Sequence, residues 1–173
     1  MRPLLRLIDA LNAAGAAVAA LACLALAVML IVEVITTSFL AWSQPWAVEY
    51  AGYLLAATLF AGSGWTLRQG GHIRVTLLTQ ALPEAARRWA DLLGSVFALG
   101  VSGFMTWASA GYALRSLERG SVSFYPSRTP LFWPQAVLAL GLALLTLALL
   151  ARAIRLLLDE APETAAEGAG GEA

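Results

Sequence analysis

The chain has 173 residues, of which 60% are hydrophobic and only 13% are charged. An average soluble domain is about half apolar and about a quarter charged, and a soluble fold this small could not bury so much apolar surface. The single cysteine also excludes a disulfide scaffold. Eleven arginines balance eleven acids, and a net charge of zero gives no support for nucleic-acid binding, which needs a basic face.

Charged residues bound four charge-free windows of about 20 residues, the length at which a helix crosses about 30 Å of hydrocarbon. The windows are residues 10–32, 50–67, 92–114 and 129–151. The sequence therefore predicts an all-α membrane protein with a single four-helix membrane domain over 1–158. Its transmembrane helices are expected at about 10–40, 48–68, 90–114 and 131–152.

The first predicted span is too long for a cleaved signal peptide, whose apolar region covers about 7–15 residues. Glu33 is the one acid that this pattern places at membrane depth. It could bind an ion or a proton, but one acid is too little for a substrate route, so a contact with a partner subunit or a neighbouring helix is the better interpretation. Trp42, Pro45 and Trp46 predict an aromatic turn at the outer interface. Glu49 is expected to cap the second helix.

The second helix is expected to end near Arg68, where Gly70 and Gly71 follow. The next segment, about 73–88, separates apolar from polar side chains at helical spacing and predicts a horizontal amphipathic helix at the membrane surface. Pro83 leaves a second boundary open, with the third helix starting there. The basic residues of this region are candidate partner or lipid-phosphate contacts, with a solvated boundary cluster as the alternative. They are Arg68, His72, Arg74, Arg87 and Arg88.

The third predicted span carries a small side chain at every fourth position, and such stripes let membrane helices approach closely. The members are Ala90, Gly94, Ala98, Ser102, Thr106 and Ala110. Chance in an alanine-rich chain is the alternative explanation. The connection over 116–130 is rich in proline and aromatic residues and predicts an ordered outer loop, with Tyr125 and Trp133 as candidate contacts. The acidic tail 159–173 is expected to be disordered.

The distribution of arginine predicts the topology. Eight arginines fall at the termini and in the middle connection, against three in the third connection. The positive-inside rule then places both termini in the cytoplasm of a bacterial cell, with the chain in the inner membrane. Arg115, Arg119 and Arg128 run against this rule.

The sequence offers little chemistry. One histidine cannot supply the axial pair of a bis-histidine haem, and no Cys/His cluster is available for zinc or iron–sulfur binding. Without lysine there is no phosphate-binding loop for ATP. We therefore expect no enzyme activity and no cofactor, and a small subunit of a larger membrane complex is the natural inference.

A known family carries a similar pattern from the start of the second helix to the horizontal helix. The pattern joins Trp46 and Glu49 to the run Arg68-Gln-Gly-Gly-His72-Ile-Arg74-Val75. It resembles the small membrane (DctQ-like) subunit of tripartite ATP-independent periplasmic (TRAP) transporters. The resemblance covers roughly residues 10–155, and the segment 127–134 also fits it. The chain departs from the pattern at Thr36 and Thr37, where many members carry a basic residue.

The resemblance implies a scaffold role beside a large elevator-type membrane subunit, which would bind the sodium that drives uptake. A periplasmic binding protein would deliver a small organic solute, which is expected to be acidic. Phospholipid is the remaining expected partner. Two alternatives stay open: an anchoring or assembly subunit of another membrane complex, and a homo-oligomeric channel that uses Glu33.

Overall fold

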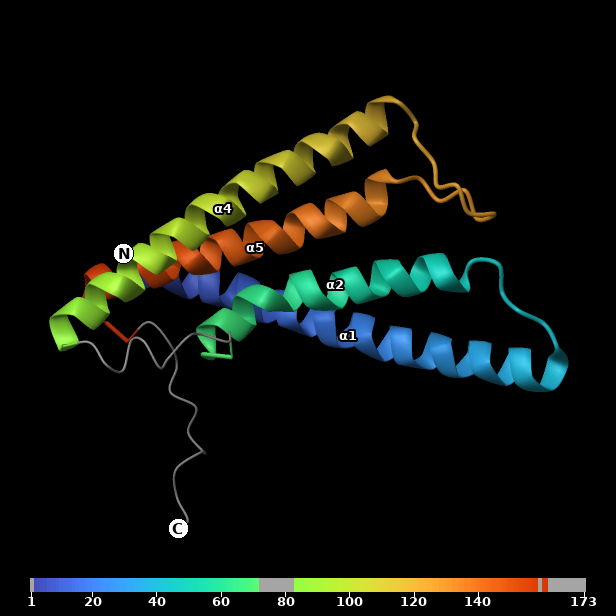
Figure 1. Ribbon diagram of the computed structural model, residues 1–173, viewed down its shortest axis with the longest axis horizontal. Helices are drawn as coiled ribbons and strands as arrows, with labels where there is room; N and C mark the ends of the chain where they lie inside the picture. Colours follow the sequence, from blue (N-terminus) through green and yellow to red (C-terminus); the bar gives the residue numbers. More distant parts are fainter. Residues whose placement is uncertain (1, 72–82, 159, 162–173) are drawn as a thin grey trace, which may run out of the picture.

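The computed structural model of the chain describes residues 2–71, 83–158 and 160–161. Within these ranges the fold is all-helical, as predicted, and Figure 1 shows the elements in chain order. The helices are α1 (Arg2–Leu40), α2 (Ala47–Arg68), α4 (Glu84–Glu118) and α5 (Phe132–Leu157). Their bounds lie close to those of the four predicted spans, although α1 begins earlier and both α4 and α5 run further.

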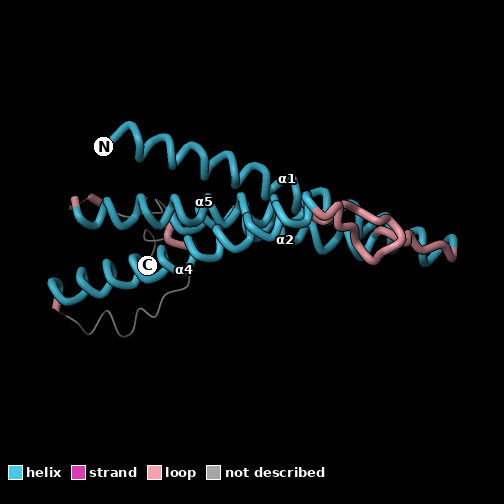
Figure 2. The backbone as a smooth tube through the Cα atoms, turned by 90° about the horizontal axis from the view of Figure 1, so that it is seen from above, coloured by secondary structure: helices cyan, strands magenta, loops and turns pink. Residues whose placement is uncertain are grey.

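The helices lie across the bundle in the order α4, α5, α2, α1 (Figure 1). Each packs against its neighbour in that order, and α1 also touches α5. We call the end where α1 begins and α5 ends the terminal end, and the end where residues 119–131 connect α4 to α5 the hairpin end. At the terminal end α1, α5 and α4 lie side by side (Figure 2). Toward the hairpin end the pair α4–α5 diverges from the pair α2–α1 (Figure 1).

Three helices in the described ranges are long and apolar enough to cross a membrane: α1, α4 from Ala86 onward, and α5. They leave many large apolar side chains exposed, including Leu24 and Ile31 on α1 and Phe97 and Phe104 on α4. Such surfaces suit contact with lipid or another membrane helix. The predicted second span, now α2, is not among the three, because Glu49 and a set of glycines and hydroxyl residues make its 22 residues less apolar.

Glycines end two of the helices. Gly70 follows α2 with φ +72° and Gly120 follows α4 with φ +58°, a left-handed conformation that glycine adopts without a steric penalty. At α2 the amide of Gly71 donates to the carbonyl of Thr66 at 2.9 Å, which closes a Schellman motif. The expected end of the second helix at Gly70 and Gly71 is thus confirmed.

The structure bears only partly on the predicted horizontal helix. Most of the segment 73–88 lies outside the described residues, as do His72, Arg74 and, apart from residues 160 and 161, the predicted tail 159–173. The last residues of the segment 73–88 belong to α4. Pro83 is the N-cap of that helix, and the carbonyl of Pro83 accepts from the amide of Arg87 at 2.9 Å. The boundary at Pro83, which the sequence left open, is the one that the structure has.

One face of α1, whose residues become small from Gly15 onward, packs against its neighbours. The buried residues of α1 alternate at spacings of three and four, the pattern of left-handed helix packing. They are Leu5, Ile8, Asn12, Gly15, Ala19 and Ala22. Glycines make the closest crossings: a Cβ on Gly15 would lie 2.6 Å from the carbonyl oxygen of Ala61, and a Cβ on Gly141 would lie 2.7 Å from the backbone of Phe60. These glycines set how closely α1, α2 and α5 approach.

Candidate interaction sites at the two ends of the bundle

An ion-pair cluster joins three helices at the terminal end. A guanidinium nitrogen of Arg155 on α5 donates to the carboxylate of Asp9 on α1 at 2.6 Å, and Nε of Arg68 on α2 lies 3.8 Å from the same oxygen. Arg155 is only 5% exposed. A buried guanidinium is tolerated when it is paired at hydrogen-bond distance, so Asp9 is what permits this burial.

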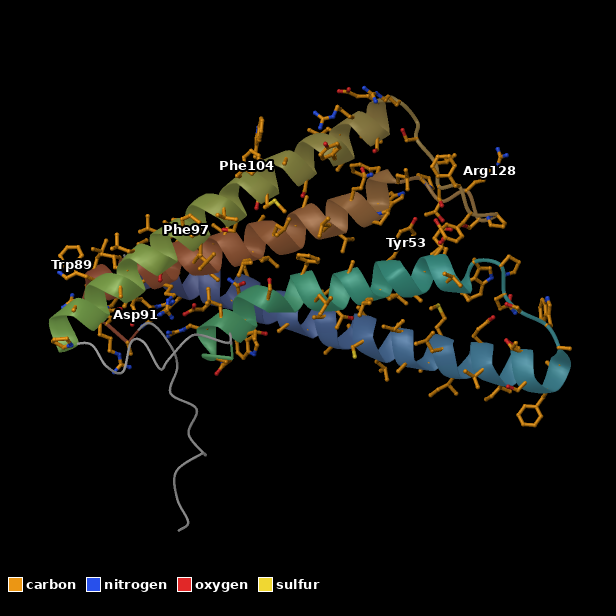
Figure 3. The ribbon with its side chains drawn as sticks, viewed as in Figure 1. Tyr53, Trp89, Asp91, Phe97, Phe104 and Arg128 are labelled. Atoms are coloured by element: carbon orange, nitrogen blue, oxygen red, sulfur yellow. The ribbon has the colours of Figure 1, made fainter. Side chains whose placement is uncertain are left out.

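A second pair ties α4 to α5 at the same end. Arg152 is also 5% exposed, and its Nε donates to the hydroxyl of Ser95 at 3.0 Å. A terminal guanidinium nitrogen of Arg152 lies 3.9 Å from the carboxylate of Asp91, which Figure 3 labels near the start of α4. Arg88 adds a bond from its guanidinium to the carbonyl of Leu156 at 2.9 Å. All four helices are therefore fastened together at the terminal end.

A buried carboxylate organises the hairpin end. Glu49, in the first turn of α2, is 4% exposed. The hydroxyl of Tyr53 donates to one of its oxygens at 2.6 Å, and the hydroxyl of Ser127 donates to the other. Since Ser127 belongs to the α4–α5 connection, Glu49 fixes that connection onto α2. Figure 3 shows Tyr53 on α2 close to this connection.

The connection is itself an ordered hairpin. Val122 and Pro130 form a β-bridge, and the amide of Ser123 donates to the carbonyl of Thr129 at 2.9 Å. At the tip, the amide of Arg128 donates to the carbonyl of Tyr125 at 3.0 Å, with Pro126 between them. Proline at the second position of such a turn is favoured because its φ is already fixed. The expectation of an ordered loop in this region is confirmed.

Glu33, near the end of α1, binds the connection that follows this helix. Its carboxylate accepts from the hydroxyl of Ser43 at 2.8 Å and from the backbone amide of Gln44 at 3.1 Å. The hydroxyl of Thr37 donates to the carbonyl of Glu33 at 2.6 Å. The bonds from Ser43 and Gln44 satisfy the half-buried carboxylate and fix the connection between α1 and α2.

The predicted aromatic contacts all lie on the surface. Trp42, Trp46, Tyr125 and Trp133 are exposed; the first two lie in the α1–α2 connection, Tyr125 in the hairpin and Trp133 in the first turn of α5. Arg87 is exposed at the start of α4. Within the described residues, no three His, Cys, Asp or Glu side chains come close enough to hold a metal ion.

The small-residue stripe follows the α4–α5 contact only over its middle. Ser102 is buried, Ala98 packs against the core cluster of Leu67, and the hydroxyl of Thr106 lies 3.0 Å from that of Thr146 on α5. Gly94 is exposed and a Cβ there would meet nothing within 4 Å. A repeat of four drifts around a helix with 3.6 residues per turn, so the stripe leaves the contact face near its start.

Of the residues in these contacts at the terminal end, the sequence singled out Arg68 and Arg88 as candidates but missed Asp9, Asp91, Arg152 and Arg155. The sequence pattern gives these two acids no role, and it uses these two arginines only in the count of charges at the termini that predicts the topology. One signal was available: in the predicted topology the two acids and the two arginines fall on the same side of the membrane, so opposite charges meet at one depth. Their pairing depends on helix neighbours that the sequence does not reveal.

Membrane-length apolar helices, joined by polar contacts at the two ends of the bundle, define a multi-pass membrane protein. Comparison with known proteins narrows this class. The profile of the family described as tripartite ATP-independent periplasmic transporters, DctQ component, matches residues 26–159. Because this match covers most of the chain, the chain belongs to the DctQ family and is a TRAP transporter small subunit. A transport family of this kind indicates a non-enzymatic subunit.

One similar curated protein is the ectoine TRAP transporter small permease protein TeaB from Halomonas elongata. It is 33% identical over 69 residues, which cover 40% of this chain and 36% of TeaB. The alignment therefore spans about a third of that relative's length.

Proposed function

We propose that this chain is the stationary scaffold of a TRAP transporter. It would support a large elevator-type membrane subunit during sodium-driven uptake of a small organic acid that a periplasmic binding protein delivers. The family match over residues 26–159 carries this proposal. The solute itself would be recognised by the partner chains, so the ectoine in the name of TeaB does not identify it here.

The packing of the bundle supports a stationary role. The buried pairs Asp9–Arg155 and Asp91–Arg152 join the helices at one end, and Glu49 joins α2 to the α4–α5 hairpin at the other. An element that slides past its neighbours would have to break such buried pairs, and breaking one costs about 3–5 kcal/mol. A body fastened at both ends resists that motion and gives a moving partner a fixed surface.

We infer that α2 is the fourth span. Its 22 residues extend about 33 Å at 1.5 Å per residue, which matches the hydrocarbon thickness of about 30 Å. It packs between α1 and α5, both of which are apolar enough to span. Such packing shields its polar groups from lipid, so α2 needs less apolar character than its neighbours.

Four spans place both termini on one side of the membrane, and the arginine distribution puts that side in the cytoplasm. The horizontal helix over 73–88 would then lie along the cytoplasmic leaflet of the inner membrane, with Arg68, His72, Arg74, Arg87 and Arg88 contacting lipid phosphate. The tail 159–173 would extend from a domain that covers 1–158. Trp42, Trp46, Tyr125 and Trp133 would lie at the outer interface.

Co-purification tests the proposal. The tagged chain, expressed with its large membrane subunit and binding protein, should bring down the large subunit in mild detergent. Proteoliposomes holding both membrane subunits should take up solute only with the binding protein and an inward sodium gradient. A different set of membrane partners would instead support an anchoring subunit of another complex.

A further inference from the structure

Three arginines at the hairpin end form an exposed basic surface. Arg115 lies in the last turn of α4, Arg119 caps that helix, and Arg128 lies at the hairpin tip, where Figure 3 shows it pointing away from the bundle. The guanidinium of Arg115 lies 4.6 Å from the ring centroid of Tyr112. Across the residues that the structure describes, no ion pair joins these three arginines to a carboxylate. Their charge is therefore available to a partner.

The acids of the hairpin end do not neutralise this surface locally. Glu49 is buried beneath the hairpin among hydroxyl donors, and Glu33 is bonded within the α1–α2 connection. Glu118 is the exposed acid at the end of α4. From the last turn of α4 through the hairpin, residues 115–131 thus carry three positive charges and one negative charge, all exposed.

Exposed aromatic rings lie beside these arginines. Phe124 and Tyr125 are exposed at the hairpin tip, and Trp133 is exposed at the start of α5. Arginine and aromatic side chains together are enriched at the centres of protein interfaces. The hairpin is held by its own backbone bonds and by Glu49, so little conformational entropy would be lost when a partner binds it.

We propose that Arg115, Arg119 and Arg128, with Phe124 and Tyr125, bind an acidic face of the periplasmic solute-binding protein. This inference rests on the proposed function, which supplies the orientation and the partner, and adds that docking on this chain is electrostatically steered. In the proposed topology these three arginines lie outside, against the positive-inside rule, and none of them pairs with an acid of the bundle in the described residues. A role in binding an acidic partner accounts for positive charge at this place. Lipid headgroups are the competing ligand. They are disfavoured because the connection extends beyond the start of α5 (Figure 1), whereas Trp133, in the first turn of α5, is expected at the membrane interface.

The test measures association of the solute-binding protein with the complete membrane complex. The chain and its large subunit are placed in nanodiscs of phosphatidylcholine, and binding is followed at about 20 mM and about 500 mM NaCl, where the Debye length falls several-fold. Replacing Arg119 and Arg128 together by Glu should slow association about tenfold or more at low salt. It should also remove most of the salt dependence that the unmodified complex shows.

Two single variants guard against misfolding. Arg128 has φ +47°, so Arg128→Gly removes the charge while relaxing the backbone, and it should slow association severalfold. Ala41→Gly is the matched control, because Ala41 has φ +49° in the other connection and carries no charge. It should associate like the unmodified complex.

Three outcomes overturn the inference. Equal association by the Arg119→Glu/Arg128→Glu complex at low salt shows that the basic surface is not used. Salt-independent association by the unmodified complex shows the same while leaving the proposed function intact. Binding of phosphatidylglycerol vesicles, lost in Arg128→Gly, with unchanged protein association assigns the surface to lipid. If the chain fails to co-purify with a large membrane subunit, the proposed function fails first.

Discussion

Asp9 is the carboxylate on which the buried Arg155 depends. Its side chain is about one-third exposed, whereas that of Arg155 is 6% exposed, so removing the acid leaves a nearly buried cation unpaired. We predict that Asp9→Ala lowers the free energy of unfolding by about 2–3 kcal/mol, less than for a fully buried pair because water reaches the acid. Thermal unfolding in detergent, followed by the loss of the monodisperse peak on size exclusion, measures this.

The exposed pair of Arg2 and Glu160 provides the control. Their charged atoms lie 3.7 Å apart, and the side chain of Arg2 is almost fully exposed. Arg2→Ala should therefore change stability by no more than about 1 kcal/mol. Equal losses for Asp9→Ala and Arg2→Ala would show that the Asp9 cluster does not fasten the helices.

Glu49 acts on a segment far away in the sequence. Both of its oxygens accept from hydroxyl groups, one of them on Ser127 in the hairpin. We predict that Glu49→Ala speeds amide hydrogen exchange over residues 121–131 about tenfold or more. The variant loses the hydrogen bond from Ser127, and such a bond to a charged acceptor is worth about 1.5–3 kcal/mol. Glu49→Gln keeps an acceptor oxygen and should show a smaller increase. Unchanged exchange in Glu49→Ala would mean that the hairpin holds itself.

Glycine positions decide how closely the helices pack. A Cβ on Gly141 would lie 2.7 Å from backbone and side-chain atoms of Phe60, whereas a Cβ on Gly52 would meet nothing within 4 Å. Gly141→Ala should therefore separate α5 from α2 and lower stability by about 1–3 kcal/mol, the usual range for overpacking. Gly52→Ala is the matched control and should be neutral or slightly stabilising, because alanine favours helix over glycine. Thermal unfolding of the two variants in the same detergent compares them directly.

The comparison of glycines also shows which helical features could be predicted from the sequence. Gly70 marked the end of α2, since a left-handed residue after a helix is a local requirement. The same signal at Gly120 could have placed the end of α4. Gly141 gave no comparable signal, because its importance depends on Phe60, a residue of another helix. A local backbone conformation can be predicted from neighbouring residues in the sequence, whereas a packing contact between two helices cannot.

At the scale of the whole molecule, the predicted helical architecture follows from where charges fall. Four charge-free windows account for α1, α2, α4 and α5 because apolar length is what a membrane selects. The fastening of the bundle could not be predicted in the same way: Asp9 and Arg155 are 146 positions apart. Only the folded arrangement, with α1 beside both α2 and α5, brings that acid and that arginine together.

The spanning role of α2 and the orientation of the chain can be tested together by cysteine labelling. Cys23 is the single cysteine, so Cys23→Ser provides a background without thiols. Single cysteines at Trp42 and Gln69 lie just before and just after α2. In intact cells a membrane-impermeant maleimide should label Trp42→Cys at once and Gln69→Cys only after permeabilisation, because four spans place these positions on opposite sides. Equal labelling of both would mean that α2 does not cross the membrane, and the reverse order would place the termini outside.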